Sequence, residues 1–457
     1  MNFVFLLSVI LKAVGAVFEI LIQILITKVL GVSGYGDYSA WINVADLIFW
    51  MFFSGIIKCN TFYLAGENTK IRVFKFRYYF RYVTPVILLL SVFAVLAGRS
   101  SILYLVIAIT VLELIVYDQS STLIARKRMK KSLIGEYVLG RAVLILGVVF
   151  LNAADRMNIM ALLLLYLLQY IIVVLFFLTG KSGPTENRED ISGTVSLKKW
   201  GSYQWADLMH SLISQMPVVV QYIFSGAFEA GVVSIVLLVK KLIGFISGPT
   251  AKIFLPEFSR LYRTGDKAQM GSYYAGIMRM QMLFIGPMAV VLLAFPAVVL
   301  QILAEELLEY TGLFMLCSVI FLLTAMLGPC GGILQMTGNE KADNRCREVS
   351  ILVMLAVMIF LRHDKLFVLY GLCAQTAVEA VGKYAFICRW LKRAPVRFMD
   401  FLGWWTIPGV VIVLAAVTGL QSSFGWMVLF AGAIFAVESY VILHTKINLS
   451  LFRKTSK

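Results

Sequence analysis

Polar side chains recur on one face of an otherwise apolar stretch, residues 3–30, near the start of the chain. They are spaced by seven, four and four residues: Lys12, Glu19, Gln23 and Thr27. An α-helix places residues at these intervals on the same face. A charged side chain at mid-bilayer costs on the order of 2.5–3.5 kcal/mol, so this face should avoid lipid. Two interpretations remain open: the face lines a water-filled cavity, or it only satisfies polar groups of neighbouring helices.

A second polar face lies in the apolar stretch 201–225. Its members are Tyr203, Asp207, His210, Ser214 and Gln221. Asp207 offers a carboxylate that could balance a cation, and His210 could exchange a proton near neutral pH. A histidine held by a structural hydrogen bond explains His210 equally well.

Two adjacent lysines occupy the middle of the next apolar stretch, 229–255. On a helix, Lys240 and Lys241 point about 100° apart, so a cavity can face only one of them squarely. We favour Lys241, because Ser234 falls on its side of the helix.

Further ionisable residues lie within apolar stretches: Asp46, Lys58, Glu113, Asp118, Glu136, Arg141, Lys252, Arg279, Glu379 and Lys383. Glu379 and Lys383 are four residues apart in the order that favours a helical ion pair, so we predict that they pair locally. Glu136 and Arg141 are predicted to lie at a cytoplasmic membrane interface.

Composition determines the class of protein. The chain has 457 residues, of which 60% are hydrophobic and only 14% are charged, and its mean hydropathy is +0.86. Soluble domains carry roughly 25% charged residues. About 20 apolar residues suffice for a helix to cross about 30 Å of hydrocarbon, and many stretches here are that long. We therefore predict an all-α polytopic membrane protein.

The apolar stretches predict about fourteen transmembrane helices. Their ranges are 3–30, 38–64, 82–98, 101–125, 132–152, 157–178, 201–225, 229–255, 272–303, 307–336, 347–361, 366–390, 401–420 and 424–444. A turn is expected from Gly31 to Ser39, and a kink or break at Pro329, which could serve as a hinge or reflect loose packing. The predicted divisions are a six-helix lobe (1–180), a cytoplasmic linker (181–200), a second six-helix lobe (201–392), and two extra helices with a cytoplasmic tail (393–457).

Lysine and arginine alternate between the predicted loops, being frequent in every second loop and in the tail. The positive-inside rule therefore places both termini in the cytoplasm. The net charge of +16 is explained by these loops and by contact with anionic lipids, so we expect no nucleic-acid partner.

The two predicted lobes begin alike. GYGDYSAW from Gly34 and GAFEAGVVSIV from Gly226 each precede a span, and a shift of 195 residues aligns Ser39 with Ser234. This is suggestive of a parallel repeat, although chance identity explains so short a window equally well.

Motifs of enzyme active sites are absent from the sequence. It has no G-x-x-x-x-G-K-[ST], H-E-x-x-H or G-x-S-x-G pattern, and its six cysteines form no C-x-x-C pair. The longest predicted loop has about twenty residues, too few for a soluble active site. We therefore expect a transporter and no enzyme, without a cofactor, a metal site or a disulfide framework.

Three segments resemble a known family. KVLGVSGYGDYSAW (Lys28 to Trp41) is similar to the first-hairpin signature of polysaccharide flippases in the multidrug/oligosaccharidyl-lipid/polysaccharide exporter superfamily. Gly231 to Asp266 is similar to the eighth helix and following loop of that family, and LQMTGNEKADN (Leu334 to Asn344) resembles the end of its tenth helix.

The resemblance implies two six-helix lobes around a cationic cavity formed by helices one, two, seven and eight, and transport by alternating access. The implied cargo is an undecaprenyl-diphosphate-linked oligosaccharide, an O-antigen or capsule repeat unit, in the bacterial inner (cytoplasmic) membrane. The implied partners are this lipid-linked glycan, membrane lipids, a coupling ion (proton or sodium) and polysaccharide assembly proteins. The expected cargo-binding residues are Lys12, Lys241, Lys58, Lys252 and Arg279. The residues expected to balance charge or couple to an ion are Glu19, Asp46, Asp207 and His210.

Alternatives remain within and outside the superfamily. A peptidoglycan lipid-precursor flippase fits the same features. A cation-coupled multidrug exporter should have an acidic, aromatic cavity, which the lysines disfavour. A polysaccharide polymerase should have a large outward loop, which is not predicted here.

Overall fold

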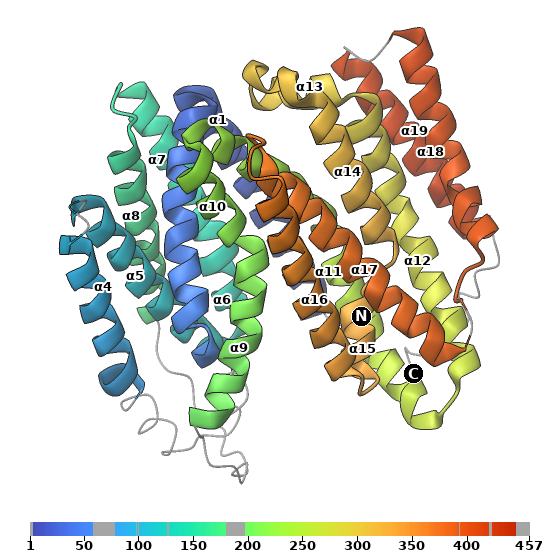
Figure 1. Ribbon diagram of the computed structural model, residues 1–457, viewed down its shortest axis with the longest axis horizontal. Helices are drawn as coiled ribbons and strands as arrows, with labels where there is room; N and C mark the ends of the chain where they lie inside the picture. The colour runs from blue at the N-terminus through green and yellow to red at the C-terminus, as the bar shows by residue number, and fades with distance from the viewer. Residues whose placement is uncertain are drawn as a thin grey trace. The chain divides into compact units, whose positions relative to one another are not determined.

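The computed structural model describes residues 3–57, 78–96, 98, 100–125, 128–179, 197–392, 394–419 and 423–444. Within these residues every regular element is a helix (Figure 1). Contacts along the chain divide it into two compact units, unit 1 (residues 1–234) and unit 2 (residues 235–457). Each unit is described by itself.

Unit 1 is built around the long helix α1. Its elements are α1 (Phe3–Phe52), η1 (Tyr79–Val83), α4 (Thr84–Leu96), α5 (Ser100–Ala125), α6 (Met129–Leu133), η2 (Ile134–Leu139), α7 (Gly140–Ala153), α8 (Ile159–Leu178), α9 (Leu197–Ser214), α10 (Met216–Ser225) and the start of α11 (Ala227–Thr264). Helices α5, α7, α9 and α10 all pack on α1. Aromatic rings, including Phe49, Phe53 and Tyr78, fill the core at the end of α1. This packing brings polar residues of α1 against several other helices.

Unit 2 contains the rest of α11 and the elements that follow it. These are α12 (Lys267–Ala289), η3 (Val290–Ala294), α13 (Pro296–Leu303), η4 (Glu305–Tyr310), α14 (Thr311–Met326), α15 (Cys330–Met336), α16 (Glu340–Phe360), α17 (Phe367–Leu391), α18 (Phe398–Thr418) and α19 (Phe424–His444). Helices α16 and α17 run side by side (Figure 1), and α12 packs on α19.

The prediction of an all-α polytopic membrane protein is confirmed. Nine helical segments among the described residues are long and apolar enough to cross a membrane. The described parts of the predicted spans are mostly helical, and the more polar spans coincide with α9 to α11, α16 and α17. Large apolar side chains such as Leu96, Leu146 and Phe150 are exposed on the helices, as a lipid-facing surface requires.

The turn expected from Gly31 to Ser39 is wrong in extent. The helical conformation is lost only at Gly31 (φ 70°, ψ 177°), and α1 resumes directly after it. Gly226, which is 195 residues further on, breaks the chain between α10 and α11 in the same way (φ 105°, ψ −175°). Glycine adopts such positive φ angles without the steric cost that a Cβ imposes. The break predicted at Pro329 is confirmed, between α14 and α15.

The two helix starts that follow Gly31 and Gly226 cross each other within unit 1. A Cβ on Gly36 would lie 1.8 Å from the carbonyl oxygen of Ala227, and one on Gly231 would lie 2.3 Å from that of Val32. A shift of 195 residues converts one contact into the other, because it places Gly36 on Gly231 and Val32 on Ala227. Ser39 and Ser234, which the same shift aligns, share a hydrogen bond of 2.7 Å. The segments that look alike in sequence therefore meet reciprocally, through glycines that permit close contact.

Candidate functional site

The polar face of the first span is held by partners inside unit 1. Arg141 on α7 donates to Glu19 at 3.4 Å, and the Tyr35 hydroxyl donates to Gln23 Oε1 at 2.7 Å. Thr27 bonds the backbone oxygen of Gln23 on its own helix. The sequence placed Arg141 at an interface and did not connect it with Glu19. The face thus contributes to helix packing, which is one of the two interpretations left open, and Glu19 and Arg141 stay partly exposed.

A second acidic group lies deeper in unit 1, between α1 and α5. Thr110 Oγ1 donates to the carbonyl oxygen of Ala45 at 3.3 Å, and the rings of Phe49 and Tyr117, one turn further along α1 and two turns along α5, stack at 5.1 Å. Glu113 lies between these two contacts on α5. Its side chain is 2% exposed, and Oε2 has no hydrogen-bond partner among the described residues.

Asp46 follows Ala45 on α1 and interacts electrostatically with Glu113. Tyr166 and Tyr170 of α8 lie within electrostatic range of both carboxyl groups. Glu113 was one of many ionisable residues in the sequence, and its pairing with Asp46 depends on the packing of α1 against α5.

The polar face of the seventh span also packs on α1. Gln204 accepts from the Gly55 backbone N–H at 2.8 Å and donates to the Trp50 carbonyl at 2.5 Å. On the following turns Asp207 is buried, whereas His210 is exposed and lies edge-on to the Trp50 ring. The missed residue here is Gln204, whose amide caps the end of α1 at Trp50 and Gly55.

The two adjacent lysines of α11 have different surroundings. Lys240 donates to Thr376 Oγ1 at 2.8 Å and lies 5.4 Å from the Phe321 ring centroid, so it is directed into unit 2. Lys241 is exposed. The side chains of Lys12 and Lys252 and the whole of Lys58 lie outside the described residues.

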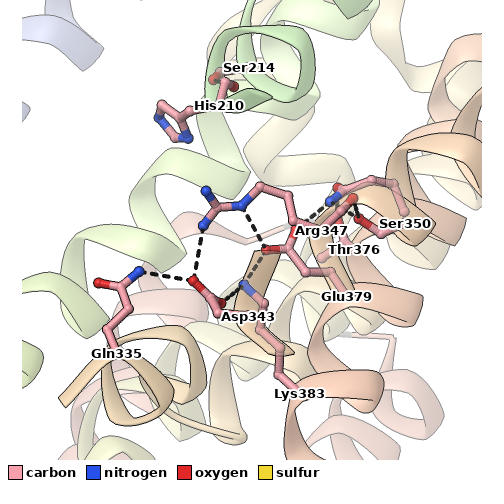
Figure 2. A network of polar contacts seen from close by, with 10 residues as sticks. His210, Ser214, Gln335, Asp343, Arg347, Ser350, Thr376, Glu379 and Lys383 are labelled. Atoms are coloured by element: carbon pink, nitrogen blue, oxygen red, sulfur yellow. Dashed lines mark hydrogen bonds and ion pairs between the residues drawn. The ribbon is translucent and has the colours of Figure 1, made fainter. Parts of the chain in front are cut away.

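A network of charges joins α15, α16 and α17 in unit 2 (Figure 2). Lys383 Nζ lies 2.5 Å from Glu379 Oε1 and 2.7 Å from Asp343 Oδ1, which confirms the predicted pair and extends it. Arg347 approaches both carboxylates at 3.7 Å, and Gln335 donates to Asp343 at 2.9 Å. Two cations thus balance two carboxylates.

Asp343 was missed because the eleventh span was predicted to start at residue 347, whereas α16 begins at Glu340. The signal was present in the sequence, since Asp343 and Arg347 are four residues apart, as Glu379 and Lys383 are.

Arg279, a predicted cargo-binding residue, has a partner within unit 2. Its Nη2 lies 3.0 Å from Glu438 Oε2 on α19, and its guanidinium lies 5.4 Å from the Trp404 ring of α18. The side chain of Glu438 is 1% exposed. These two contacts link α12 to α18 and α19, the two C-terminal helices. Sequence analysis missed Glu438, although it is the single acidic residue in its predicted span.

We expect Arg279→Met to destabilise unit 2, because it leaves the buried Glu438 carboxylate without its cation. Breaking one partner of a buried pair costs about 3–5 kcal/mol. The double variant Arg279→Met with Glu438→Gln should recover part of that loss in thermal unfolding of the purified chain. Equal unfolding temperatures for the wild type and Arg279→Met would contradict a stabilising pair.

Comparisons with known proteins show that the structure of this chain is similar to solved structures of other proteins. No protein-family profile and no curated protein sequence matches the chain. A solved structure of a lipid II flippase, MurJ in an inward closed conformation, is 12% identical and covers 99% of this chain and 100% of its own, with a TM-score of 0.66. A MATE protein in complex with MaL6 is also 12% identical, covering 85% of this chain and 96% of its own with a TM-score of 0.54. The chain is therefore a multi-pass membrane protein with the fold that these two proteins share.

Proposed function

We propose that this protein is a flippase that moves an undecaprenyl-diphosphate-linked oligosaccharide, an O-antigen or capsule repeat unit, across the bacterial inner membrane. The observation that carries the proposal is the match to a lipid II flippase along 99% of the chain, with α18 and α19 included. The MATE match leaves part of the chain uncovered. The fuller coverage by the lipid II flippase supports a flippase for a lipid-linked cargo.

Physical chemistry supports a protein-assisted path for such a cargo. Each sugar hydroxyl that enters hydrocarbon unpaired costs several kcal/mol, and an ionised diphosphate costs far more. Lysine ammonium groups can offset the diphosphate charge through charge-assisted hydrogen bonds. Because Arg279 has Glu438 as its partner, we assign cargo binding to Lys12, Lys241, Lys58 and Lys252.

The acidic residues of the proposed transport path have a different role. In this proposal Glu19, Asp46 and Asp207 offset cationic side chains when no cargo is bound, and with His210 they are candidates for ion coupling. The termini and the basic loops face the cytoplasm.

A lipid-linked peptidoglycan precursor is the second candidate cargo. The structure that matches nearly the whole chain is itself a lipid II flippase, and a diphosphate-binding role for the lysines suits either cargo.

The test follows the lipid-linked glycan in a deletion strain by leaflet-selective labelling. We expect it to accumulate facing the cytoplasm while surface polysaccharide disappears, and the intact gene should reverse both effects. Arrest of peptidoglycan synthesis would favour the second cargo. Normal surface glycan with new sensitivity to cationic drugs would overturn the flippase proposal in favour of a multidrug exporter.

Two lysine variants test the cargo site. Lys12→Ala and Lys241→Ala should each lower flipping by about tenfold or more, since one charge-assisted hydrogen bond contributes about 1.5–3 kcal/mol. Lys241→Arg should retain activity because it keeps the positive charge. Lys341→Ala is the control, since Lys341 is exposed on α16 and lies in a predicted cytoplasmic loop. Unchanged flipping by both correctly inserted alanine variants would refute this site.

A further inference from the structure

We propose that Glu113 and Asp46 form a carboxyl pair that binds one exchangeable proton inside unit 1. The ligand is a proton, and the site is the space between α1 and α5. The proposal rests on the burial of Glu113, on its Oε2 atom, which has no hydrogen-bond partner among the described residues, and on the contacts that hold the two helices in register.

The register brings the two carboxyl groups to the same level. The bond from Thr110 to Ala45 lies just before Glu113 along α5, and the stacked rings of Phe49 and Tyr117 lie just after it. The same two contacts enclose Asp46 on α1. Each contact is direct, at 3.3 Å for the hydrogen bond and 5.1 Å between ring centroids. Glu113 therefore faces the part of α1 that carries Asp46, and the two groups interact electrostatically.

Other ionisable groups around the pair come from each neighbouring element. Those in electrostatic contact with one or both carboxyl groups, or with the tyrosines beside them, are Tyr38, Tyr117, Glu136, Tyr137, Arg141, Tyr166 and Tyr170. Arg141 is the cation in this set, and it pairs with Glu19 at 3.4 Å. The positive charge of Arg141 is thus offset by Glu19.

Two carboxylates that share a buried site cannot both be ionised at modest cost. A single bound proton removes the repulsion and makes one group a neutral donor. Glu113 carries this proton, because its side chain is 2% exposed while Asp46 is only partly buried. Any movement of α1 relative to α5 would change the repulsion and therefore the affinity for the proton. The use of this proton to drive transport rests on the proposed function, whereas the site itself does not.

Infrared difference spectroscopy of the purified full-length protein in lipid nanodiscs tests the site directly. Near neutral pH we expect the carbonyl band of a protonated carboxylic acid, sensitive to deuterium exchange and absent from Glu113→Gln. Asp46→Asn should shift the loss of this band to lower pH, because the neighbouring negative charge is gone. Glu309→Gln is the matched control, since Glu309 is exposed in unit 2, and its spectrum should keep the band.

Three results would overturn the proposal: no such band in the wild type, a band that survives in Glu113→Gln, or a band displaced by sodium at constant pH. The last would assign the pair to a metal cation. If Glu113→Gln fails to fold, the pH shift in Asp46→Asn tests the same pair. A protein with the expected band that flips no lipid-linked glycan would retain this site and contradict the proposed function.

Discussion

Gly231→Ala is expected to destabilise unit 1 severely and to reduce transport. The added Cβ would lie 2.3 Å from the carbonyl oxygen of Val32 and 2.9 Å from a methyl group of the same residue. Because the nearest atom belongs to the backbone of α1, no side-chain rotation relieves the clash, and the two helices must separate. Overpacking of this kind costs about 1–3 kcal/mol or more. Gly36→Ala should behave similarly, since its Cβ would meet the Ala227 carbonyl at 1.8 Å.

A matched control lies on the same helix. Gly244 of α11 has no atom within 4 Å of an added Cβ, so Gly244→Ala should leave stability unchanged or raise it by up to about 1 kcal/mol through helix propensity. Thermal unfolding in detergent, followed by tryptophan fluorescence, compares the variants. Similar unfolding temperatures for Gly231→Ala and Gly244→Ala would show that the crossing of α1 and α11 tolerates separation.

Lys383→Met should strongly destabilise unit 2. Methionine keeps an unbranched apolar stem of four heavy atoms but removes the ammonium that lies 2.5 Å from Glu379 and 2.7 Å from Asp343. Arg347, at 3.7 Å from each carboxylate, is then the one cation that still forms an ion pair with Asp343 and Glu379 among the described residues. Loss of one partner from a buried charge network costs about 3–5 kcal/mol. We expect a lower unfolding temperature and less correctly folded protein in the membrane.

A second substitution identifies the cause of that loss. Lys383→Met with Glu379→Gln restores equal numbers of positive and negative charges, so it should recover part of the stability in a double-mutant cycle. Lys341→Met is the control, because Lys341 is exposed on α16. If the double variant is no more stable than Lys383→Met, the imbalance of charge is not the cause of the loss.

Local features of the sequence determined the class of this protein, most of its helices and one of its ion pairs. Apolar stretches of membrane-spanning length give its class and its helices, because a backbone in lipid must satisfy its own hydrogen bonds. The spacing of Glu379 and Lys383 predicted their ion pair, and Pro329 among glycines predicted a helix break. The shift of 195 residues aligned Ser39 with Ser234 before any contact between them was known. Each of these features depends on residues within a few helical turns of one another or, for the shift of 195 residues, on a segment that occurs twice in the chain.

The tertiary structure decided which faces of the helices pack against each other. Spacing places Glu19 on a polar face, but its pairing with Arg141, 122 residues away, requires α1 to pack on α7. Likewise the two lysines of α11 differ because Lys240 contacts Thr376 and Phe321, and Glu113 lies near Asp46 because α5 packs against α1. Helical periodicity specifies the direction of a side chain around its own axis. Its partner depends on how helices distant in sequence pack together, which is a property of the whole fold.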